Sequence, residues 1–110
     1  MAKDDYFVIT YKLLKYLYDC LKKSGEPNME VIDATYFSIG KPYWDYIVRH
    51  LQEDGYIDGV LTFPIQGGKA GVKITREIAI TPKGIQYLEE NTVFQKIKRE
   101  VKDIAEILPM

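Results

Sequence analysis

Two side chains of the sequence could form a nucleophilic pair, the thiol of Cys20 and the imidazole of His50. A cysteine attacks as the thiolate, and a neighbouring histidine can take its proton. The apolar spacing places Cys20 on the buried stripe of one predicted helix and His50 on the flank of another. We therefore expect Cys20 to be an inert core residue and the protein not to be an enzyme.

The sequence also gives little support for a metal site or a phosphate-binding loop. One cysteine and one histidine cannot supply a zinc site of about four ligands, and we expect no metal and no cofactor. The stretch "GGKAG" at 67–71 has the glycines and lysine of a phosphate-binding loop, but Ala70 stands where that pattern needs serine or threonine. A predicted strand, not a helix, follows it. We interpret the stretch as the tip of a hairpin.

A third group of side chains could contact nucleic acid. Arginine can read guanine, tyrosines can donate to phosphate or pack on sugar and thymine methyl groups, and lysines can contact the phosphate backbone. The candidate residues are Lys41, Tyr43, Tyr46, Arg49, Lys69 and Lys73. Exposed tyrosines beside an arginine suit a protein interface equally well, because aromatic residues and arginine carry much of the binding energy there.

The charge of the chain weighs against strong binding to nucleic acid. The net charge is −1, so the whole molecule is not attracted to phosphate. Between Asp33 and Gly55 there are two bases, Lys41 and Arg49, and four acids, and 2 − 4 gives a local charge of −2. Because affinity grows with the number of phosphates neutralised, a monomer would bind DNA weakly and a dimer would double the contacts.

The apolar pattern predicts the elements that must position these residues. From Asp4 to Ser24 apolar residues recur at steps of three and four, which predicts one amphipathic helix that Gly25 ends. The predicted inward face of this helix holds Tyr6, Ile9, Leu13, Leu17, Cys20 and Leu21.

The next segment predicts a short strand near Met29–Val31 and then a short helix, capped by Asp33, that runs through Ser38. Pro42 suits the first position of a further helix, from Pro42 to Asp54, that Gly55 closes. The inward face of this helix holds Trp44, Ile47, Val48 and Leu51, and its outward face carries Tyr46, Arg49 and Glu53.

Two runs of branched and aromatic residues, Val60 to Ile65 and Val72 to Ile80, flank the glycine-rich loop and predict a hairpin. Pro64 cannot donate a ladder hydrogen bond, so we expect it near the loop or on an edge. One face of the return strand holds Val72, Ile74, Ile78 and Ile80, with Arg76 as the only interruption.

After the hairpin, Thr81 caps a helix that begins at Pro82 and turns Ile85 and Leu88 inward. A break follows near residues 91 and 92. The last stretch carries an apolar seam of Phe94, Ile97, Val101, Ile104 and Leu108. We predict a winged-helix domain over 1–91 and a C-terminal amphipathic helix over 92–110, which either packs on the domain or forms a homodimer contact.

Three helices, a two-to-three-stranded wing hairpin and a further helix follow one another in the order of a winged helix-turn-helix domain. We therefore predict an α+β fold of this type, with an extended C-terminal helical segment. A four-helix bundle would leave the hairpin and its turn residues unexplained.

Three stretches carry a resemblance to a known family. "EDGYIDGV" follows the amphipathic helix, and "ITPKGIQYLEEN" and "FQKIKREVKDI" come after the hairpin. Over about 48–107 the sequence resembles the YjcQ-like family, small winged-helix proteins of low-GC Gram-positive bacteria and their phages. The resemblance implies the winged-helix fold and no particular activity.

The sequence also bears on location. No apolar stretch approaches the roughly 18 residues of a membrane span, and "MAKDDYF" has two acids where a signal peptide needs basic residues before an apolar run. We expect a cytoplasmic protein.

Two functions remain open. The first is a DNA-binding winged-helix protein, a transcriptional regulator of bacterial or prophage origin, with the helix from Pro42 to Asp54 in the major groove of duplex DNA. The second is a protein–protein interaction module that keeps the winged-helix scaffold without binding DNA.

Overall fold

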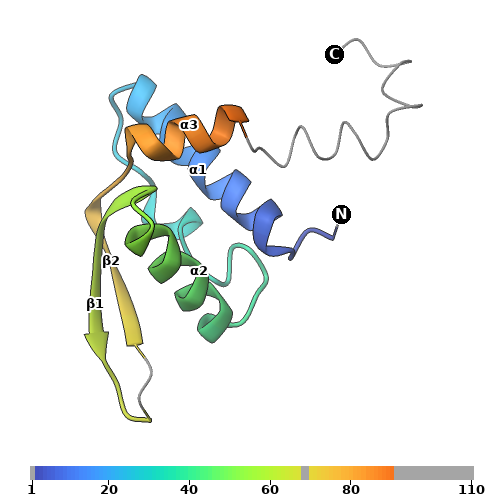
Figure 1. Ribbon diagram of the computed structural model, residues 1–110, viewed down its shortest axis with the longest axis vertical. Coiled ribbons are helices and arrows are strands. Elements are labelled where there is room, and N and C mark those ends of the chain that lie inside the picture. Colours follow the sequence, from blue (N-terminus) through green and yellow to red (C-terminus); the bar gives the residue numbers. More distant parts are fainter. Residues whose placement is uncertain (1, 68–69, 91–110) are drawn as a thin grey trace.

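The computed structural model describes residues 2–67 and 70–90. Along the chain these form α1 (Tyr6–Lys22), the short 3-10 helix η1 (Met29–Val31), α2 (Lys41–Glu53), β1 (Ile57–Pro64), β2 (Ala70–Ile80) and α3 (Pro82–Glu90). α1 runs between α2 and α3, and the antiparallel hairpin β1–β2 projects away from the helices (Figure 1). The predicted α+β fold is confirmed, and it is compatible with a winged helix that has a two-stranded wing. The predicted helix over 92–110 and its apolar seam lie outside the described residues.

The core lies where the inward faces of the helices meet one face of the hairpin. As predicted, Trp44, Ile47, Val48 and Leu51 of α2 are buried, and Leu88 of α3 is buried with them. The other large members are Ile9, Leu13, Leu14, Leu17, Ile32, Ile57, Val60, Val72, Ile78 and Ile80. Fully burying each such side chain stabilises the fold by roughly 1.5–3 kcal/mol, so this shared face decides how the elements meet.

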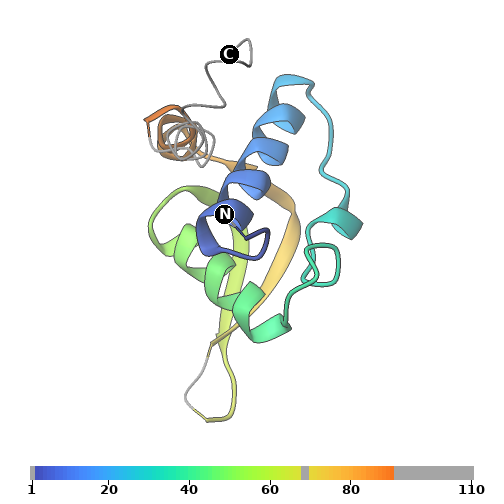
Figure 2. The same cartoon turned by 90° about the vertical axis from the view of Figure 1, so that its right-hand side faces the viewer.

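The inward face of α1 differs from the prediction near its end. Leu21 is 51% exposed and Cys20 is only partly buried. The last turn of α1 projects past the elements that cover its middle (Figure 2). Burial therefore centres on Ile9, Leu13 and Leu14 instead.

Two predictions for the connection between α1 and α2 are wrong. Met29–Val31 is a turn of 3-10 helix and not a strand, because the Asn28 side chain accepts a hydrogen bond from the backbone N–H of Glu30. Residues 34–38 form successive turns and not a helix. Asp33 does accept from the N–H of Thr35, but Ser38 adopts φ +58°, which ends the segment before a helix can propagate.

The strands are longer than predicted, and a bulge at Gly59 interrupts their pairing. Ile57 pairs with Ile80, but Val60 pairs with Ile74, so the register shifts between them. Gly59 adopts φ +89°, which glycine tolerates because it has no Cβ. The bulge lets Ile57 and Val60 both face the core although they are three positions apart.

The same bulge explains how Arg76 interrupts the apolar face of β2 without being buried. Arg76 is exposed because it lies in the stretch of β2 opposite Gly59, where the regular ladder is broken. Thr75 in that stretch donates its hydroxyl to the carbonyl of Gly59 at 2.7 Å. Pro64 ends β1 opposite Ala70 at the tip, as its missing donor predicts.

A tight joint connects the end of α2, the start of β1 and the start of α3. Gly55 leaves α2 with φ +83°. Thr81 donates its hydroxyl to the carbonyl of Gly55 at 2.5 Å and accepts from the N–H of Gly84 at 3.1 Å, which confirms it as the cap of α3. Lys83 donates to the carbonyl of Asp54 at 2.8 Å. The hairpin and α3 are therefore fixed to the same point.

No helix within residues 2–67 and 70–90 has both the length and the apolar character needed to cross a bilayer.

Gly84→Ala is expected to destabilise the protein, because the new methyl group would meet the carbonyl oxygen of Tyr56 and lie 2.7 Å from a side-chain carbon of Ile80. Overpacking of this kind costs about 1–3 kcal/mol. Gly25→Ala is the matched control, since a methyl group there meets nothing within 4 Å. Urea unfolding should show a lower midpoint for Gly84→Ala only. Equal midpoints for the two variants would contradict the tight joint.

Tyr43 fastens the start of α1 to α2, since its hydroxyl donates to the backbone carbonyl of Asp4 at 2.8 Å. Burial, and then the charges of Asp4 and Asp5, raise the pKa of Tyr43 above its usual value of about 10. The neutral phenol is thus favoured in the folded state, and its contribution is complete below about pH 10 and lost as the pH rises through the folded pKa.

Tyr43→Phe is expected to lower the free energy of unfolding by about 0.5–1 kcal/mol at neutral pH, because one hydrogen bond is lost. The difference from the wild type should shrink above about pH 10, where the wild-type phenol ionises and can no longer donate. Tyr36→Phe, on a ring that is 61% exposed, is the control. Urea unfolding across this pH range measures both effects, and a difference that does not change with pH would refute the assignment.

Candidate nucleic-acid interface

An open groove of about 650 Å³ lies between α2 and the tip of the hairpin. The wall from α2 is mostly polar and the wall from the hairpin is apolar. The lining residues are Lys41, Pro42, Asp45, Tyr46, Arg49, Ile65 and Ala70. The groove thus brings together three of the predicted binding residues, Lys41, Tyr46 and Arg49.

The sequence of α2 explains why these three side chains share one wall. Trp44 and Val48 are buried, with exposed fractions of 3% and 0%, and they fix the inward face of the helix. Ile47 shares that face and is 0% exposed, whereas Tyr46 and Arg49 fall on the opposite side of the helix, given the 3.6-residue period. Gly40 and Pro42 start the helix so that Lys41 lies in its first turn.

Both cations of the groove contact carboxylates. The amine of Lys41 lies 2.9 and 3.1 Å from the two carboxylate oxygens of Asp45. The guanidinium of Arg49 lies 3.3 Å from a carboxylate oxygen of Glu53. Each partner is four residues further along α2, which is the spacing at which side chains meet on a helix. The groove is therefore a surface of paired charges and not a continuous positive strip.

Tyr46 supplies the aromatic surface of the groove. It is 50% exposed. Its ring centre lies 4.3 Å from that of His50 and 6.4 Å from that of Tyr6, which it meets edge to face. These neighbours hold the ring beside Arg49 while its outer side remains accessible.

The other predicted binding residues do not join the groove. Tyr43 donates to Asp4 and belongs to the contact between α1 and α2. Lys73 is exposed, but Val72 and Ile74 on either side of it line a hollow with Trp44, so alternation along β2 turns Lys73 to the opposite face of the hairpin. Lys69 lies outside the described residues.

Two features of the groove were missed in the sequence. The pairing of Lys41 with Asp45 and of Arg49 with Glu53 could have been found, because the four-residue spacing was visible. The contribution of Ile65 could not, because it depends on how far the hairpin bends toward α2.

The residues first considered for catalysis and metal binding lie on separate elements. Cys20 is near the end of α1, and His50 is on α2 with its ring against Tyr46. In the part of the chain that the structure describes, no cluster of three or more histidine, cysteine or acidic residues could hold a metal ion.

Comparison with known proteins gives one match. Among curated proteins and among solved structures no significant match is found. The sequence model described as "YjcQ protein" matches residues 11–107, which is most of the chain. This match includes α1 from Tyr11 onward, α2, the hairpin and α3. The chain therefore belongs to the YjcQ family.

Proposed function

We propose that this protein binds duplex DNA through the outward face of α2, with the hairpin beside it. The observation that carries the proposal is the gathering of Lys41, Tyr46 and Arg49 in one open groove between α2 and the hairpin tip. A major groove about 12 Å wide admits an α-helix, and a side chain such as Arg49 can then pair with a guanine edge. In this role the protein would act as a transcriptional regulator.

The paired carboxylates set the strength of such binding. Exposed ion pairs at this spacing contribute about 0.3–0.5 kcal/mol, so a phosphate or a base can replace Glu53 as the partner of Arg49 at little cost. The displaced carboxylate nevertheless stays close to the DNA and repels it. We therefore expect weak affinity with a steep dependence on salt.

The test uses variants that remove one charge each. Glu53→Gln should tighten binding to DNA by about fivefold. The substitution frees Arg49 and removes a repulsion between Glu53 and the DNA that costs up to about 1 kcal/mol. Asp19→Asn is the matched control: it removes a carboxylate that pairs with Lys15 on α1, away from the groove. Fluorescence anisotropy with a random-sequence duplex at low salt measures the affinities.

The same assay distinguishes recognition of the DNA sequence from contact with the phosphate backbone. The Arg49→Ala variant should lose its preference for a site selected from a random duplex pool, whereas Lys69→Ala should weaken binding to all DNA sequences alike. No detectable binding to duplex at low salt, for the wild type and for Glu53→Gln, would refute the proposal.

A second candidate, a protein–protein interaction module, is favoured by the exposed apolar side chains of β1 and the hairpin tip, of which Ile65 lines the groove. Leu61, Phe63 and Ile65 are 57%, 45% and 44% exposed, and Tyr46 is 50% exposed. Aromatic and apolar residues with paired charges at the edge are typical of protein interfaces.

The interaction module is tested by a pull-down from a lysate of the source cells. Tyr46→Ala should abolish capture of a partner that the wild type retains, because the groove loses its main aromatic contact. Tyr36→Ala is the control, since Tyr36 is 61% exposed and lines a different hollow. Capture unchanged by Tyr46→Ala would count against this function. Loss of the partner in Tyr46→Ala, combined with no DNA binding by the wild type, would favour this function over the first.

A further inference from the structure

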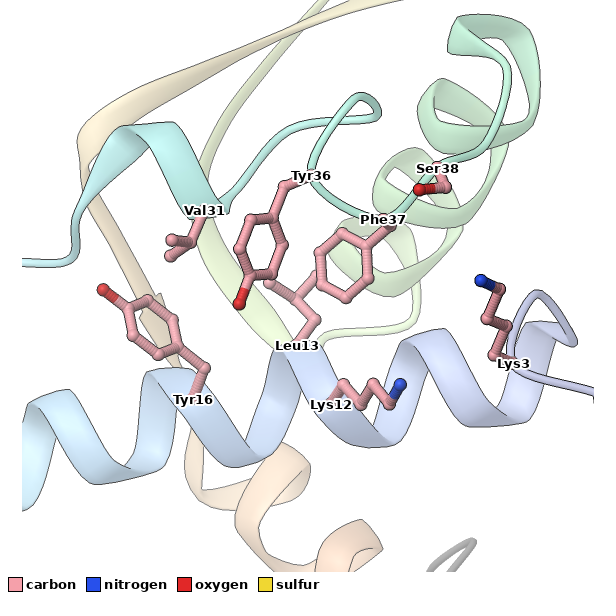
Figure 3. Close-up of a pocket in the computed structure, with 8 residues that line it drawn as sticks. All are labelled: Lys3, Lys12, Leu13, Tyr16, Val31, Tyr36, Phe37 and Ser38. Atoms are coloured by element: carbon pink, nitrogen blue, oxygen red, sulfur yellow. The ribbon is translucent and has the colours of Figure 1, made fainter.

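A second hollow, of about 490 Å³, lies between α1 and the segment that leads from η1 to α2. It is lined by apolar and aromatic side chains in its middle and by two lysines at one end (Figure 3). The lining residues are Lys3, Lys12, Leu13, Tyr16, Val31, Tyr36, Phe37 and Ser38. It shares none of these residues with the groove on α2.

The aromatic side chains of the hollow are held in place by contacts with neighbouring residues. Phe37 stacks on the buried Trp44 with ring centres 5.4 Å apart, and Tyr36 meets Phe37 edge to face at 5.3 Å. The hydroxyl of Tyr16 accepts a hydrogen bond from the backbone N–H of Asn28 at 2.7 Å. Because these rings are fixed by their neighbours, an aromatic surface is available to a ligand without first being assembled.

The charged end of the hollow differs from the groove on α2. Lys3 and Lys12 lie at the same end, beyond Phe37, and Ser38 adds a hydroxyl there (Figure 3). The lining contains no carboxylate. Among the described residues neither lysine forms an ion pair, whereas Lys15 on the same helix pairs with Asp19 at 2.9 Å. The two amines therefore present positive charge that the hollow does not neutralise.

We propose that this hollow binds a small aromatic anion, with its ring against Tyr36 and Phe37 and its carboxylate or phosphate between Lys3 and Lys12. The volume falls in the range of about 300–1,000 Å³ that is usual for small-molecule sites. Fixed aromatic walls with a few convergent polar groups are the chemistry that recognises a flat apolar body with one charged end. The proposal does not depend on whether the α2 groove binds DNA or protein.

The test compares three probes of one shape with the full-length protein. Naphthoate carries a carboxylate, naphthyl phosphate a phosphate, and naphthamide no charge. Calorimetry should show that at least one of the two anions binds about tenfold more tightly than the amide, since hydrogen bonds to charged groups are the stronger ones. The tighter anion identifies the natural chemistry. In NMR spectra, amide shifts should map to Leu13, Tyr36 and Phe37.

Substitutions then separate the two parts of the site. Lys12→Gln should weaken binding of the anions by about tenfold and leave the amide unchanged, and Lys15→Gln, on the same helix, should change neither. Tyr36→Ala should weaken all three probes. Equal affinity for anion and amide, an anion affinity that Lys12→Gln does not change, no binding at millimolar concentration, or shifts that map to the α2 groove would each overturn the proposal.

Discussion

The arrangement of the molecule depends on the burial of one side chain, Trp44 of α2. Its indole is 3% exposed and stacks on Phe37, while Val72 and Ile74 of the hairpin lie close by. Rotating α2 about its axis would expose this large apolar surface, so the indole determines which residues of α2 meet solvent. The outward position of Tyr46 and Arg49 is a consequence of this burial and does not require any contact of their own.

Much of the fold could be predicted from the sequence because its signals are local. The inward face of α2 follows from helical spacing, and the cap by Thr81 from residue type. The segment 29–38 could not be predicted, because distant partners decide it: Tyr16 holds Asn28, and Trp44 holds Phe37. The candidate site was predicted in part. Spacing identified Lys41, Tyr46 and Arg49, whereas the bonding of Tyr43 to Asp4 is visible only in three dimensions.

The two hollows show how different surfaces arise from similar residues. Both contain two cations and at least one exposed aromatic ring. On α2 each cation has an acid four residues later, and the charges cancel locally. Around Lys12 no acid lines the hollow. The net charge of −1 averages over these regions and describes neither of them, which is why whole-chain composition was a poor guide to either site.

The bulge at Gly59 makes the hairpin sensitive to the number of its residues more than to their identity. Between the pairs Asp58–Ala79 and Val60–Ile74, β1 has one residue and β2 has four, so the extra residues of the bulge lie on β2. Removing one residue from the stretch Thr75–Ile78 would, under regular alternation, place Val72 and Ile74 on the opposite face from Ile78 and Ile80, so length variation in this family should spare this stretch and occur at the hairpin tip.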